Sequence, residues 1–133
     1  MKQHYGCPIK ATLNVMSGKW KVLALWYLSF KPQRFAELRD LLPGVTEKVL
    51  TTQLRELEQD GVISRKSTHD SPPKVTYSLT KAGRDLIPLM EEMCDWGTKH
   101  LGIPPNFPLL PRLARRSARR SVFLLPSRAE LSL

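Results

Sequence analysis

The sequence lacks the features that mark secreted, membrane-spanning and disulfide-bonded proteins. Two cysteines, Cys7 and Cys94, are too few for a disulfide framework in a chain rich in leucine and valine, so both are expected to be free thiols. No run approaches the ~20 apolar residues that a membrane span needs. Residues 1–6 also lack the hydrophobic region of a signal peptide. These absences together predict a cytoplasmic protein.

Motifs for catalysis and for metal binding are equally scarce. The chain has no phosphate-binding glycine loop, no nucleophile motif and no paired carboxylates in an apolar setting. His4 and His100 add to the cysteines as possible metal ligands, but no pair has the close spacing of a zinc site. We therefore expect no enzyme, no metal and no cofactor. The acids in helical segments fit exposed faces: Glu56, Glu58, Asp60, Glu91 and Glu92.

Acidic residues are also few relative to basic ones. The 133 residues include 21 Lys and Arg but only 12 Asp and Glu, which gives a net charge of +9 and a pI near 9.9. A chain of this length forms one domain with its own core. Such a charge favours a polyanionic partner, and nucleic acid is the first candidate.

Residues 46–61, TEKVLTTQLRELEQDG, predict a short amphipathic helix. Leu50, Leu54 and Leu57 fall at i, i+4 and i+7, so they form one stripe that must be buried. Thr46 suits the N-cap and is also a candidate DNA contact at the start of the helix, and Gly61 tolerates the backbone conformation that ends a helix. A solvated helix face is the plain alternative, and the following residues weigh against it. The exposed face offers groups that bind phosphates and base edges: Lys48, Thr51, Thr52 and Arg55.

After this helix the pattern changes from helical to alternating. Residues 62–68 and 74–79 flank the turn-forming segment 70–73, which predicts a two-stranded hairpin. Residues 34–42 predict another helix, which precedes the helix at residues 46–61. Helix, turn, helix and hairpin is the order of a winged helix-turn-helix, in which the second helix lies in the DNA major groove. The fold class is thus mainly α with a small β-hairpin wing. The wing carries four basic residues: Arg65, Lys66, His69 and Lys74.

Several short motifs follow one another in a specific order. They are Cys7-Pro8, Gly18-Lys19-Trp20-Lys21, residues 34–38 (RFAEL), residues 54–63 (LRELEQDGVI), residues 72–83 (PPKVTYSLTKAG) and Trp96-Gly97. On these motifs, residues 6–102 resemble the HxlR-type family of bacterial winged-helix transcription regulators, relatives of the MarR type. The resemblance implies a homodimer that binds operator DNA through the second helix of each motif and the wings. Repression is the expected outcome of that binding.

The two terminal helices are predicted to join two copies of the chain. Residues 8–17 predict the first helix, and residues 80–101 predict the last one, with Pro88 kinking it. The last helix has apolar residues at alternating spacings of four and three, which is typical of a coiled-coil seam. A helix packed in its own chain would look similar, but pairing across a twofold axis is favoured in so small a domain. Candidate interface residues are Leu13, Leu89, Met93 and Trp96.

Residues 20–28 predict a core helix between these elements. Its aromatic residues, among them Trp20 and Trp26, could form a ligand box, but packing explains their helical spacing better.

A dimer assigns separate roles to the basic residues. Two reading helices about one DNA turn apart, ~34 Å, suit the half-sites of an inverted repeat. Arg55 or Lys48 is the candidate for a bidentate contact to guanine, whereas Thr51 and Thr52 could contact a thymine methyl group or a phosphate. The wing cations are expected to bind phosphates or the minor groove and so to set affinity and salt dependence.

Cys7 is the candidate for a chemical switch. It precedes Pro8 at a helix start, where free N–H groups and the helix dipole favour a thiolate, and Lys10 lies one turn on. The family resemblance implies the same role, because some members sense thiol oxidation through a cysteine at this position. The alternative is an unreactive thiol in the dimer interface. Cys94, beside the seam of the last helix, is expected to be a buried structural thiol.

Residues 103–133 fall outside the resemblance. Five of the eleven prolines lie there, which ends the last helix and predicts an irregular extension. Its arginines allow three interpretations: no specific function, an arm on DNA phosphates, or an amphipathic segment on a membrane surface. For the whole chain the rival function is a winged-helix module that binds protein instead of DNA. The basic residues on the second helix and the wing favour DNA.

Overall fold

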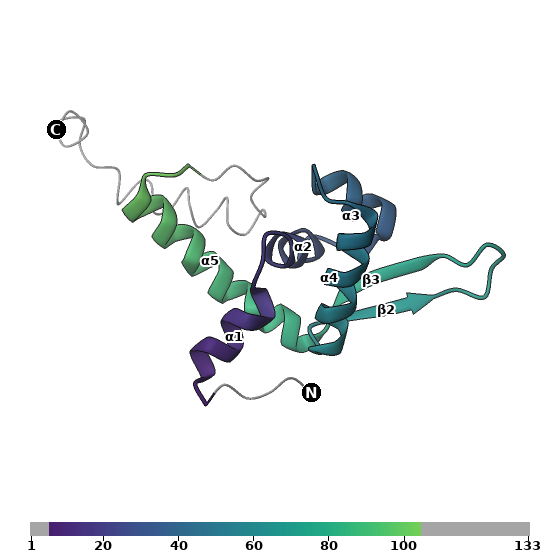
Figure 1. Cartoon of the computed structure of the whole chain (residues 1–133), viewed down its shortest axis with the longest axis horizontal. Coiled ribbons are helices and arrows are strands. Elements are labelled where there is room, and N and C mark those ends of the chain that lie inside the picture. The colour runs from purple at the N-terminus through teal and green to yellow at the C-terminus, as the bar shows by residue number, and fades with distance from the viewer. Residues whose placement is uncertain (1–5, 105–133) are drawn as a thin grey trace. The chain divides into compact units, whose positions relative to one another are not determined.

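The computed structural model describes residues 6–104 and confirms the predicted fold class (Figure 1). The described chain divides after Met90 into two units. Its elements are α1 (Pro8–Met16), α2 (Lys21–Leu28), β1 (Gln33–Arg34), α3 (Phe35–Leu41), α4 (Glu47–Gln59), β2 (Ile63–Ser67), β3 (Val75–Leu79) and α5 (Lys81–Leu101). Each predicted helix begins and ends within about one residue of the expected position. The predicted extension lies outside the described residues from residue 105 onward.

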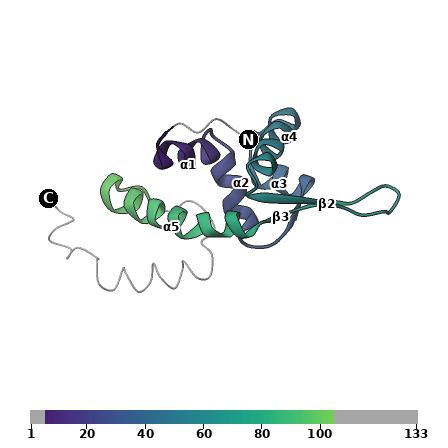
Figure 2. The ribbon, with the colours of Figure 1, turned by 90° about the horizontal axis from the view of Figure 1, so that it is seen from below.

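The hairpin is confirmed and gains a third strand. The strand order is β1-β3-β2, with every pair antiparallel. β2 and β3 run in register from Ile63 opposite Leu79 to Ser67 opposite Val75. β1 adds only two residues, with Gln33 opposite Tyr77, and so short a strand leaves no alternation in the sequence to predict it. Figure 1 and Figure 2 both show the loop between β2 and β3 extending beyond the helices, as a wing does.

The core lies among α2, α3 and α4. The predicted stripe of α4 is buried, with Leu50 and Leu57 fully covered and Leu54 1% exposed. α3 contributes Leu38, and the residue after it, Leu42, is equally buried. Burying one such side chain stabilises the fold by about 1.5–3 kcal/mol. α2 supplies the remaining wall with Ala24, Leu25, Trp26 and Leu28, so packing accounts for Trp26.

α3 begins with a side-chain bond at its first turn. The backbone N–H of Arg34 donates to a carboxylate oxygen of Glu37 over 3.2 Å. This bond lowers the pKa of Glu37, and the nearby Lys31 ammonium acts in the same direction. The start of the helix-turn-helix is therefore held by local contacts.

The start of α5 is tied to the junction between α4 and β2. Thr80 donates its hydroxyl to the carbonyl of Gly61 over 2.6 Å and its backbone N–H to the carbonyl of Val62 over 3.1 Å. The same hydroxyl accepts the N–H of Gly83 over 3.2 Å and so caps the helix. Gly83 is buried against Val62, and a methyl group added to it would lie 2.0 Å from the Val62 carbonyl oxygen. Only glycine permits this approach.

α5 continues through Pro88 and exposes the predicted seam. Ile87 and Met90 are the buried apolar residues of the helix, at 9% and 5% exposure. The candidate interface residues of the seam are instead exposed to solvent, Leu89 at 42%, Met93 at 45% and Trp96 at 58% of the residue's full exposure. Among the described residues, no helix is long and apolar enough to cross a membrane.

The prediction of exposed acids is wrong for Glu91. Its exposure is only 9%, because it follows Met90 and lies one turn after Ile87 on the buried side of α5. Glu56 and Asp60 are half-buried, whereas Glu58 and Glu92 are exposed as predicted.

Candidate nucleic-acid interface

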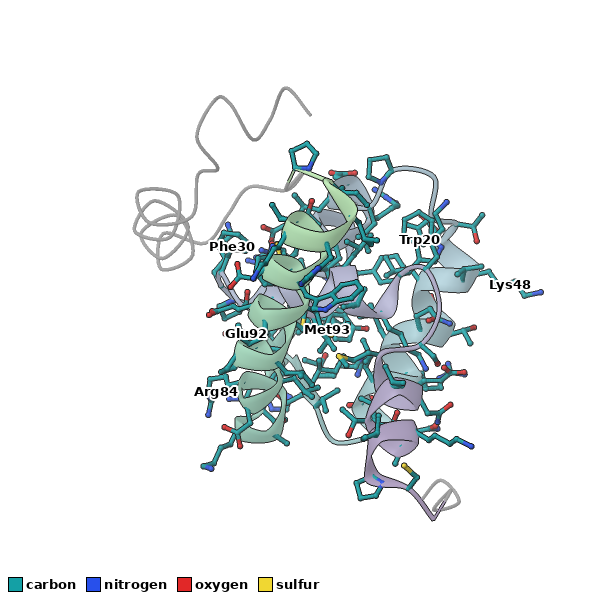
Figure 3. The ribbon with its side chains drawn as sticks, turned by 90° about the vertical axis from the view of Figure 1, so that its left-hand side faces the viewer. Trp20, Phe30, Lys48, Arg84, Glu92 and Met93 are labelled. Carbon is teal, nitrogen blue, oxygen red and sulfur yellow. The ribbon has the colours of Figure 1, made fainter. Side chains whose placement is uncertain are left out.

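The outer face of α4 carries four of the five residues predicted to contact DNA, and the fifth, Thr46, precedes the helix. Thr46, Lys48, Thr51, Thr52 and Arg55 are exposed, and the leucine stripe occupies the opposite face. Thr46 is the N-cap, since its hydroxyl oxygen accepts the backbone N–H of Val49 over 3.2 Å. Figure 3 shows Lys48 extending away from the ribbon into open space. The helix therefore presents a polar, basic surface along its N-terminal half.

The two threonines use their hydroxyl protons within the helix. Thr51 donates to the carbonyl of Glu47 over 2.7 Å, and Thr52 donates to the carbonyl of Lys48 over 3.0 Å. Such bonds fix each side chain and leave a methyl group and an acceptor oxygen for an outside partner.

The wing carries the other four predicted residues. Arg65 and Lys66 lie on β2, His69 lies in the loop and Lys74 precedes β3, and all four are exposed. In the register of the sheet, Arg65 is opposite Tyr77 and Lys66 is opposite Thr76. Within the described part of the chain, the ion pairs engage none of the cations Arg65, Lys66 and Lys74, nor Lys48 or Arg55. Their charge is thus available to a polyanion.

Two ion pairs hold α4 in place from neighbouring helices. Lys21 of α2 is only 3% exposed and pairs with Glu56 of α4, whose side chain is 37% exposed. Arg39 of α3 pairs with Glu47 at the start of α4 over 2.5 Å. A buried lysine requires such a partner, because an unpaired charge in the interior is costly. The burial of Lys21 could not be predicted from the sequence, since nothing in its local pattern separates a buried from an exposed lysine.

The exposure of Val49 on α4 was also not predicted from the sequence. It lies at the third position of α4 and is 39% exposed, although valine is usually buried. The signal was present in the sequence, because Val49 falls outside the stripe formed by Leu50, Leu54 and Leu57.

The two cysteines are free thiols, as predicted. Cys7 is half-buried and forms the N-cap of α1. Cys94 is half-buried instead of buried, and that burial, helped by the charge of Asp95, raises the pKa of its thiol. On α1, Ile9 and Leu13 are exposed at 71% and 52%, so the helix that follows Cys7 has an open apolar face.

Comparison with known proteins decides the family. The model of the HxlR-like helix-turn-helix family matches residues 15–103. This chain belongs to the HxlR-like helix-turn-helix family. As a member, it is a helix-turn-helix transcriptional regulator and not an enzyme, and membership implies that it binds DNA.

Two Bacillus subtilis proteins illustrate the similarity of this HxlR-like regulator to its relatives. The HTH-type transcriptional regulator YdeP is 50% identical over 95 residues, which cover 71% of this chain and 74% of YdeP. The HTH-type transcriptional regulator YybR is 47% identical over 102 residues, which cover 77% of this chain and 82% of YybR.

The fold also matches that of solved regulators. The reduced form of the redox regulator HypR is similar with a TM-score of 0.68 and 42% identity, over 71% of this chain and 96% of HypR. The reduced form of the transcriptional regulator YodB from B. subtilis is similar with a TM-score of 0.66 and 30% identity, over 71% of this chain and 93% of YodB. HypR has also been solved oxidised, and YodB after diamide treatment.

Proposed function

We propose that this HxlR-like regulator is a repressor that binds an inverted-repeat operator as a homodimer. The observation that carries the proposal is the basic surface that the exposed cations of α4 and the wing form. Its cations are exposed and engaged in no ion pair among the described residues. A surface that bound protein would more often expose apolar side chains there. A regulator of this kind works beside the chromosome, in the cytoplasm.

Within this surface, α4 and the wing have different tasks. Arg55 or Lys48 makes a bidentate contact to guanine. Thr51 and Thr52 lie on the same outer face toward the groove, and Thr46 lies at the N-terminus of the helix. The wing residues Arg65, Lys66, His69 and Lys74 bind the phosphate backbone or the minor groove.

Selection of binding sites from random DNA with the full-length protein tests this division. Enrichment of an inverted repeat supports the proposal. Arg55→Ala should then relax the preference for guanine at one position of each half-site. Each lost base contact should reduce the discrimination against other bases by about 1–3 kcal/mol. Lys66→Ala should weaken binding to every sequence and reduce the salt dependence by about one phosphate contact. Gln59→Ala, at an exposed position near the end of α4, is the matched control.

Two results would contradict the proposal. Equal effects of Arg55→Ala and Lys66→Ala on all sequences would remove the division of roles. A pool with no enriched site would favour the protein-binding module instead.

The dimer would form through the terminal helices. Both helices expose large apolar side chains to solvent in a single chain. They are Ile9 and Leu13 on α1, and Leu89, Met93 and Trp96 on α5. Large apolar side chains exposed on a helix commonly mark a protein interface. A twofold axis would also place two copies of α4 on the two halves of an inverted repeat.

Trp96→Glu tests the dimer, because a charge in an apolar interface is costly while an exposed Trp96 adds little to the fold of one chain. We expect a monomer in sedimentation velocity and loss of binding to the operator. Thr98→Glu places the same charge at an exposed polar position of α5 and should remain dimeric. A dimeric Trp96→Glu protein with intact binding would exclude this interface.

Oxidation of Cys7 would alter operator binding. Its thiol lies at the start of α1, next to the exposed face formed by Ile9 and Leu13, and the similar regulator HypR exists in reduced and oxidised forms. Two Cys7 thiols of a dimer can give up two electrons and two protons to diamide and form one intersubunit disulfide. A mixed disulfide with a small thiol is the other route. Either product would reorient the reading helices.

Comparison of Cys7→Ser with Cys94→Ser isolates the switch. Operator binding is measured for each with dithiothreitol and with diamide. We expect the response to diamide in the parent and in Cys94→Ser, and its loss in Cys7→Ser. An unchanged response in Cys7→Ser would end this part of the proposal.

A further inference from the structure

An apolar side chain interrupts the polar surface of the reading helix. Val49 is 39% exposed, whereas the leucines of α4 are at most 1% exposed. At about 100° per residue, Val49 and Thr52 are three residues apart and share one side of the helix. Scattered exposed valines are ordinary. This one lies at the third residue of α4, in the half of a recognition helix whose side chains contact base edges.

The two threonines on the outer face of α4 add methyl groups to this surface. Thr51 and Thr52 each have one hydroxyl proton, and each donates it to a carbonyl of the preceding turn. Neither can donate to the acceptors of guanine without giving up that bond. Their remaining outward groups are a methyl and an acceptor oxygen. The patch of Val49 and Thr52 therefore contains methyl groups and no free donor.

We propose that Val49, with the methyl group of Thr52, packs against the C5-methyl group of a thymine in each operator half-site. Thymine alone among the four bases presents a methyl group in the major groove. Opposite this patch, a guanine would leave two acceptors without a donor, and desolvated polar groups without partners are costly. α4 thus selects thymine through Val49 and Thr52 and leaves the contacts to guanine to its cations. The inference rests on the proposed function, because it requires that α4 enters the major groove.

Replacement of thymine by deoxyuridine tests the contact, since this change removes only the C5-methyl group and retains base pairing. Each thymine of the selected operator is replaced in turn, and binding is measured at fixed salt. We expect about fourfold weaker binding at one position of a half-site, the effect of exposing one methyl-sized group. Replacement in both half-sites should weaken binding by roughly fifteenfold.

Val49→Ala and the replacement of thymine by deoxyuridine together form a double-mutant cycle. Alanine favours the helix, and Val49 is partly exposed, so the fold is retained and circular dichroism checks it. The variant should lose most of the difference between the thymine and deoxyuridine operators, because only the Thr52 methyl remains as a partner of the thymine methyl. Gln59→Ala, at the far end of the same helix, should keep the full difference.

The possible outcomes separate the inference from the function on which it rests. If an operator is selected but no deoxyuridine weakens binding, the inference is wrong and the regulator stands. If Val49→Ala keeps the dependence on the methyl group, the effect arises from DNA shape or another residue, and the inference is again wrong. If no operator is selected, the proposed function fails and the inference fails with it.

Discussion

Gly83 is the position where one added methyl group tests the packing of the fold most sharply. It lies in the first turn of α5, where alanine is intrinsically the better residue by up to about 1 kcal/mol. Helix propensity alone therefore predicts that Gly83→Ala stabilises the protein. The packing predicts the opposite, because the new methyl group would lie 2.0 Å from the carbonyl oxygen of Val62 and 3.2 Å from a methyl of Leu79.

The size of the effect follows from what must move. An ordinary carbon-to-oxygen contact is about 3.3 Å, so α5 and the Val62 backbone would have to separate by more than ~1 Å. That displacement stretches the two bonds from Thr80, to the carbonyls of Gly61 and Val62. Each is worth about 1 kcal/mol, and the overpacking adds about 1–3 kcal/mol. After the gain in propensity, a net loss of about 2–4 kcal/mol in the free energy of unfolding remains.

Thermal unfolding followed by circular dichroism measures this loss. For a folded region of this size, the expected fall in melting temperature is about 10–30 °C. Gly97→Ala is the control within α5, because nothing lies within 4 Å of its added methyl group, and it should melt at the parental temperature or above. Scans at several protein concentrations separate an effect on the fold from one on the proposed dimer. A Gly83→Ala protein that melts no lower than its parent would refute the reasoning.

Three further changes test other contacts. Glu56→Gln should destabilise the fold by about 2 kcal/mol in urea titrations, because it removes the carboxylate that pairs with the buried Lys21; adding Lys21→Met should restore part of the loss, and simple additivity would contradict the pairing. Thr46→Ala should cost about 1 kcal/mol through the lost N-cap and weaken DNA binding in the same samples; an unchanged midpoint would exclude the cap. Since burial raises the pKa of Cys94, iodoacetamide should modify this thiol more slowly at pH 8 in the folded chain than in urea, as read by mass spectrometry. The matching contribution to stability is present below the ordinary thiol pKa and is lost as pH rises above it.

Local patterns in the sequence were enough for most of the fold. The leucines of α4 recur at the period of a helix, and the strands of the wing alternate on either side of a turn rich in proline. Caps and stops act within a few residues, so Thr46 and Gly61 marked the bounds of α4 correctly. The exposed cations could be placed for the same reason, because a residue outside a buried stripe faces away from the core. The family followed from the order of short motifs.

The tertiary structure decided what depends on residues distant in the sequence. The burial of Lys21 requires α2 to lie against Glu56, and the need for glycine at residue 83 requires α5 to approach the backbone of Val62. The two residues of β1 form a strand only because β3 offers its edge. Periodicity specifies which side of an element is apolar. It carries no information on which other element covers that side, because that contact is made only when the chain has folded.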